Sequence, residues 1–97
     1  MKYYTRLEVV ELLEIDEPFL VSLEREDVVL RDAPPEAEGD YSELMLERAR
    51  VAQNLVRDLE VNLPGVAVIV RLREEMVGLR RHVQDLLAQL GQKPRAR

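Results

Sequence analysis

The sequence lacks the residues on which several classes of protein depend. It contains no cysteine and a single histidine, His82, which excludes disulfide bonds and thiolate metal sites and leaves little from which to build an imidazole site. The glycines are isolated from one another, and no sequence pattern pairs Ser22 or Ser42 with a histidine. A phosphate-binding loop and an activated nucleophile are therefore both missing. We expect no enzyme activity, no metal and no cofactor.

Long apolar runs are also missing. A membrane-spanning helix needs about 18 uninterrupted apolar residues, and no run in this chain approaches that length. Charges interrupt the first segment, MKYYTRLEVVELLE, so it has no apolar stretch of the signal-peptide type. These absences predict a cytoplasmic protein with no membrane partner.

The charge is divided unevenly along the 97 residues, although the net charge is only -5. Residues 1–31 contain eight acidic and four basic side chains, and residues 32–63 contain eight acidic and three basic ones. Residues 64–97 reverse the balance with three acidic and seven basic side chains. Residues 1–63 are therefore acidic, and we call them the head. An acidic head repels phosphate backbones and attracts basic protein surfaces, so it favours a basic protein partner over nucleic acid.

The first thirty residues predict two short helices joined by a turn. Thr5 followed by Glu8 forms a capping-box pattern, which predicts a helix over residues 6–13. Asp16 is a good N-cap, and it precedes a second apolar face over residues 17–26. The short connection makes the pair a helix-turn-helix candidate.

The next segment predicts a small wing and a longer helix. Residues 28–30 read as one short strand, residues 31–40 as an exposed loop rich in proline and acid, and Tyr41 as the returning strand. Ser42 then serves as the N-cap of a third helix that reaches Leu59. Its apolar stripe recurs at spacings of three and four residues: Met45, Ala49, Ala52, Val56, Leu59 and Leu63.

The segment that begins at Pro64 could start either a strand or a helix. Residues 66–70 are mostly β-branched, which favours a buried strand. From Ile69 onward, however, the apolar residues recur at alternating spacings of three and four over three heptads, which a strand cannot produce. We therefore predict a helix over residues 64–90, with Pro64 in its first turn, and a flexible basic tail over residues 91–97.

This last helix would be roughly 40 Å long, too long to be covered by a head of residues 1–63. An intramolecular seam is one interpretation of the apolar stripe, and a coiled coil with a second copy is the one we prefer. The predicted dimerisation residues are Leu72, Met76, Leu79, Val83, Leu86 and Leu90. The predicted fold is mainly α: a winged helix-turn-helix head followed by a long C-terminal dimerisation helix.

The order of these elements resembles the MerR family of winged-helix regulators, which dimerise through an antiparallel coiled coil of the last helix. Two residues match the family's wing-to-helix junction, Tyr41 and Leu46. Family members typically read Y-T-x-x-E-V-A-x-L-x-G-V-S-x-x-T-L-R-Y-Y-E-R-x-G-L-I. The matching residues here are Tyr4, Thr5, Glu8, Val9, Leu12, Ile15, Leu20, Glu24, Arg25 and Val28.

The departures from this pattern fall on the residues that would touch DNA. Where the family carries Arg-Tyr-Tyr on its recognition helix, this chain has Val21, Ser22 and Leu23, and Gly39 replaces the arginine of the wing. DNA affinity depends on neutralising phosphates with lysine and arginine. A DNA-binding regulator is therefore the alternative, and not the first choice.

The segment that leads into the last helix carries a further pattern, L-x-x-x-L-x-x-x-x-P-G-[VI]-x-V-x-[VL], on Leu55, Leu59, Pro64, Gly65, Val66, Val68 and Val70. In this pattern the chain resembles the chaperone-modulator branch of the superfamily, the CbpM family. The resemblance implies a homodimer that binds the J-domain of a DnaJ/CbpA-type co-chaperone and restrains its action on DnaK. Such J-domains present a basic helix, which an acidic head could cover.

The carboxylates expected to bind this partner lie in and after the second helix: Glu17, Glu24, Glu26 and Asp27. The alternative is a merely solvated acidic surface, which is the usual meaning of scattered carboxylates.

Overall fold

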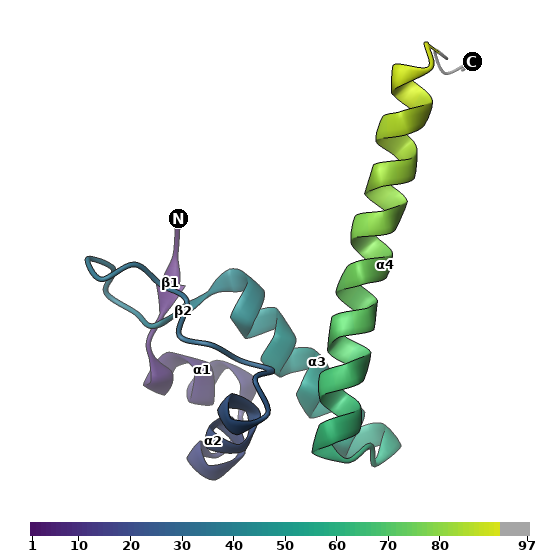
Figure 1. Ribbon diagram of the computed structural model, residues 1–97. Coiled ribbons are helices and arrows are strands. Elements are labelled where there is room, and N and C mark those ends of the chain that lie inside the picture. The colour runs from purple at the N-terminus through teal and green to yellow at the C-terminus, as the bar shows by residue number, and fades with distance from the viewer. Residues whose placement is uncertain (92–97) are drawn as a thin grey trace.

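The structure is a computed structural model that describes residues 1–91 and is mainly helical. The predicted tail therefore falls, from residue 92 on, outside the described residues. Figure 1 shows α1, α2 and a short sheet gathered around α3, while α4 extends away from them as a long rod. The elements are β1 (Tyr3–Tyr4), α1 (Arg6–Leu13), α2 (Glu17–Arg25), β2 (Tyr41–Ser42), α3 (Glu43–Leu59) and α4 (Leu63–Gln89).

Each helix begins at a polar side chain that accepts a hydrogen bond from a free backbone N–H of the first turn. Thr5 and Glu8 form the predicted capping box of α1, with hydrogen bonds of 3.1 and 2.9 Å. Asp16 caps α2 and Ser42 caps α3, as predicted. Asn62 caps α4 by accepting from the Gly65 N–H at 2.8 Å. The strand interpretation of residues 66–70 is excluded.

The wing differs from its prediction in one strand. Tyr41 does lie in a strand, but β2 pairs antiparallel with β1, so that Tyr4 faces Tyr41, and residues 28–30 form no strand. Val28 and Val29 are instead buried at the end of α2, where both N–H groups donate to the Leu23 carbonyl. A strand with one solvated face alternates between buried and exposed residues, whereas both valines are buried here.

Gly39 lets the loop before β2 approach β1 closely. A Cβ at Gly39 would lie 2.5 Å from the carbonyl carbon of Tyr4, closer than any real contact. The neighbouring Asp40 N–H donates to the Tyr4 carbonyl at 2.9 Å. Glycine is therefore required at this position by close backbone approach.

The core is centred on α3, which contacts α1, α2, α4 and both strands. The first half of its predicted stripe is buried: Met45, Ala49 and Ala52. The stripe does not continue as predicted to its end, because Leu59 is 68% exposed. There α3 stops at Glu60, which adopts a left-handed conformation and turns the chain toward α4.

Helix α4 uses only its first turns to pack against the head. Val66 and Val70 are buried, whereas all six predicted dimerisation residues are exposed, from 45% for Leu86 to 73% for Leu90. At 3.6 residues per turn, that apolar stripe faces away from α3. Within residues 1–91 the stripe therefore forms no intramolecular seam, which corrects that interpretation.

Candidate functional site

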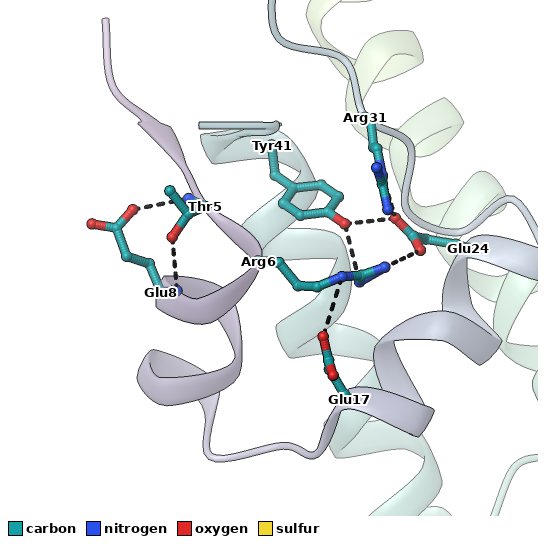
Figure 2. A network of polar contacts seen from close by, with 7 residues as sticks. All are labelled: Thr5, Arg6, Glu8, Glu17, Glu24, Arg31 and Tyr41. Atoms are coloured by element: carbon teal, nitrogen blue, oxygen red, sulfur yellow. Dashed lines mark hydrogen bonds and ion pairs between the residues drawn. The ribbon is translucent and has the colours of Figure 1, made fainter. Parts of the chain in front are cut away.

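The predicted partner-binding carboxylates lie on α2 and in the turn that follows it, but they are not equivalent. Glu24 is the centre of a polar network that joins α1, α2 and the sheet (Figure 2). One of its oxygens, Oε1, accepts from Arg6 at 2.9 Å. The other, Oε2, accepts from the Tyr41 hydroxyl at 2.6 Å and from Arg31 at 3.2 Å. Glu24 therefore links α1, α2, β2 and the loop that precedes β2.

The network changes the acidity of both its central groups. Burial by itself would raise the pKa of Glu24, but the hydrogen bonds from Tyr41 and Arg31 and the charge of Arg6 outweigh it and lower the pKa. Burial and the hydrogen bond to Glu24 raise the pKa of Tyr41 to about 12. Glu24 is thus held as a carboxylate and Tyr41 as a neutral donor.

The other three predicted carboxylates are more accessible. Glu17 is 64% exposed at its side chain and forms an ion pair with Arg6 at 3.4 Å. Asp27 is exposed and Glu26 is half-buried. Within residues 1–91, neither of these last two carboxylates makes a hydrogen bond or an ion pair, so both are free to meet an external cation.

At the three positions where α2 differs from the Arg-Tyr-Tyr pattern, the helix has no side chain that could make specific contacts with DNA bases. Leu23 is completely buried, and the Ser22 hydroxyl donates to the Pro18 carbonyl at 3.0 Å. Val21 is half-buried and apolar. The single arginine of the helix is Arg25, at its last turn. This surface cannot neutralise a row of phosphates.

The loop before β2 adds further acidic side chains. Asp32 is used structurally, because its two oxygens accept from the N–H and the hydroxyl of Ser42 at 2.9 and 2.6 Å. Glu36, Glu38 and Asp40 are exposed. The solvent-facing side of the head is therefore acidic both at α2 and at the loop.

A bidentate ion pair attaches helix α4 to the head. Arg48 of α3 donates to both oxygens of Glu74, at 2.9 and 2.8 Å, and its third nitrogen lies 3.4 Å from the Val28 carbonyl. The structural roles of Arg6 and Arg48 were missed by the sequence analysis. No local pattern indicated them, because Arg6 and Glu24 are 18 positions apart and Arg48 and Glu74 are 26 apart.

Helix α4 also presents an open apolar surface along one side, from before Glu74 to beyond it. A hollow of about 530 Å³ runs along one side of it, and every residue that lines it belongs to α4: Ile69, Leu72, Arg73, Met76, Val77 and Arg80. A continuous row of exposed apolar side chains on a single helix is typical of a coiled-coil contact.

Residues 1–91 lack two kinds of feature. No helix there is both long enough and apolar enough to cross a membrane. No group of three histidine, cysteine or acidic side chains in that range is arranged to hold a metal ion.

Comparison with known proteins gives a match to one family and matches to several curated relatives. The family described as MerR HTH family regulatory protein matches residues 4–87. Chaperone modulatory protein CbpM from Coxiella burnetii strains Dugway 5J108-111, RSA 331 / Henzerling II and CbuG_Q212 is 33% identical over 46 residues. That alignment covers 47% of this chain and 43% of each relative, less than half of their length. No solved structure matches the chain.

Proposed function

The chain belongs to the MerR HTH family of regulatory proteins, and from this premise we propose that it is a chaperone modulator. It binds the J-domain of a DnaJ/CbpA-type co-chaperone in the cytoplasm and restrains the action of that co-chaperone on DnaK. The similarity to chaperone modulatory protein CbpM supports this choice within the family.

The observation that carries the proposal is the acidic surface where a DNA-reading surface would be needed. At two of the three positions where α2 differs from the Arg-Tyr-Tyr pattern, the residue is apolar or buried. The carboxylates of Glu26 and Asp27, which follow α2, are unpaired within the described part of the chain. A basic helix of a partner would be attracted to such a surface, and a phosphate backbone would be repelled.

The acting unit in this proposal is a homodimer. Residues 1–63 form the head, and the helix over residues 64–90 pairs with the same helix of a second copy through the exposed stripe on α4. The arrangement is supported by the position of the stripe, which faces away from α3, so a second copy can cover it without displacing the head.

A binding experiment with the isolated J-domain of a CbpA-type co-chaperone tests the proposal. Isothermal titration at low and at high salt should show a complex that weakens as salt screens the charges. Absence of any complex at low salt would reject the proposed function.

The alternative is a DNA-binding regulator, which the family description favours by itself. A gel-shift assay with DNA from upstream of the gene separates the two. Sequence-specific binding at physiological salt would support the regulator, and binding to the J-domain alone would support the modulator.

A further inference from the structure

A second hollow, of about 270 Å³, lies between the end of α2 and the first turns of α4. Its head side carries Glu26, Asp27 and Val28, and its α4 side carries Ala67, Val70 and Arg71. The Arg48 and Glu74 ion pair that attaches α4 to the head also lines it. The hollow therefore exists only because α4 is held against the head in this position.

The chemistry of this hollow combines apolar walls with unsatisfied negative charge. Val28 and Val70 are almost completely buried, at 2% and 5% exposure, and Ala67 packs against the same core. Glu26 and Asp27 stand in the same lining without an ion pair in residues 1–91, whereas Glu24, two residues earlier, is fully engaged. The two free carboxylates that follow α2 therefore adjoin apolar surface in this hollow.

We propose that this hollow is the place where the partner inserts a lysine or arginine side chain from its basic helix. Such side chains bury an aliphatic stem against apolar surface while their charged end stays near water and carboxylates. The partly exposed Ala67, together with the small exposed edges of Val28 and Val70, contacts the stem, and Glu26 and Asp27 pair with the charge. This inference rests on the proposed function and adds that α4 is itself part of the recognition surface.

Arg71 allows a separate test, because its positive charge repels the lysine or arginine side chain of the partner. It lines the same hollow from α4, is exposed and makes no ion pair within the described residues. Its positive charge opposes an incoming cation. Removal of the Arg71 charge should therefore strengthen the complex, which damage to the fold would not do.

The first test removes the two carboxylates without changing their shape. We compare the double variant Glu26→Gln and Asp27→Asn with the control Glu36→Gln and Glu38→Gln, by titration with the J-domain of a CbpA-type co-chaperone. Both pairs change the net charge by the same amount, and the control residues are exposed on the loop. Asparagine is chosen because Asp27 has a φ of 59°, which asparagine tolerates. The first pair should weaken binding about tenfold, and the control should change it less than about threefold.

The second test uses Arg71→Gln, with Arg81→Gln on the exposed distal part of α4 as its matched control. Arg71→Gln should strengthen binding about threefold, and Arg81→Gln should leave it nearly unchanged. Circular dichroism of each variant checks that the helices are retained.

The outcomes separate the two claims. No binding by the unmodified protein at low salt rejects the proposed function. Binding by the unmodified protein that falls equally in both carboxylate pairs, or that weakens in Arg71→Gln, overturns the hollow as the contact and leaves the function standing.

Discussion

At the scale of single residues, the head depends on Glu24, whose carboxylate joins α1, α2 and β2 (Figure 2). From the sequence, Glu24 was predicted to be one of the partner-binding carboxylates, because residue spacing alone cannot show which acidic side chains are paired within the fold. Its side chain is only 20% exposed, and all its described contacts are internal. Substitution of Glu24 would therefore disturb the fold before it disturbed a partner.

Glu24 and Tyr41 should make the stability of the head dependent on pH. The pKa of Glu24 is lowered from 4.5, so its contribution is complete above pH 4.5 and is lost as the pH falls further. The pKa of Tyr41 is raised from 10.0 to about 12, so its contribution is complete below pH 10 and is lost as the pH rises toward 12. Urea unfolding across these ranges measures both losses.

The variant Glu24→Gln serves as the comparison for the acid range. It should unfold at lower urea at neutral pH and should lose less stability on acidification than the unmodified protein. An identical acid dependence in the two proteins would show that Glu24 does not contribute.

Gly39 and Gly78 should respond oppositely to the same substitution. Gly39→Ala places a methyl group against the Tyr4 backbone and should lower the free energy of unfolding by more than about 2 kcal/mol. Gly78→Ala meets nothing within 4 Å and should raise it by up to about 1 kcal/mol through helix propensity. Thermal unfolding of both variants measures this. Similar effects of the two substitutions would contradict the close approach at Gly39.

At the scale of elements, the ion pair of Arg48 with Glu74 determines how α4 meets the head. The hydrogen bonds to Glu74 raise the pKa of Arg48, and the two side chains are 20% and 31% exposed. We expect Arg48→Gln to lower the free energy of unfolding by about 1–2 kcal/mol, after allowance for partial solvent screening.

Arg50→Gln is the control for this substitution. Arg50 pairs with Glu47 on the same helix, but both side chains are more than 40% exposed, so the cost should stay below about 0.5 kcal/mol. Urea unfolding compares the two variants. Equal costs would mean that the contact between α3 and α4 does not depend on Arg48.

The elements that could be predicted from the sequence are those with a local signal. The starts of the helices followed from Thr5, Asp16, Ser42 and the segment at Pro64, because a cap acts on neighbouring N–H groups. The wing could not be predicted in the same way. Its strands have two residues each, and β1 precedes the helices that separate it from β2, so no alternation or turn identifies the pairing.

For the candidate site, too, features with a local sequence signal could be predicted and features that depend on tertiary contacts could not. The acidic character of the head and the apolar stripe of α4 are properties of composition and period, and both were predicted. The pairing of Glu24 and the hollow beside α4 depend on tertiary contacts between residues far apart in the chain.

At the scale of the whole molecule, α4 extends well away from the head (Figure 1), and the apolar stripe that it carries is exposed. Leu79 is 63% exposed and lies in the middle of the stripe. Leu79→Glu should convert the proposed dimer to a monomer, because it places a charge in the seam, while the head stays folded.

Gln84→Glu is the control, since it adds the same charge to α4 at a position outside the stripe. Analytical ultracentrifugation should show a dimer for the control and a monomer for Leu79→Glu. A dimer in both would place the contact elsewhere on the molecule.

The proposed restraint of a co-chaperone can be measured through the rate of ATP hydrolysis by DnaK. A J-domain of the CbpA type is added to DnaK to stimulate hydrolysis, and the protein is then titrated into the mixture. Hydrolysis should fall toward the rate of DnaK alone, and the double variant Glu26→Gln with Asp27→Asn should restore the stimulated rate. Stimulated hydrolysis that stays unchanged at saturating protein would show that the protein does not restrain the co-chaperone.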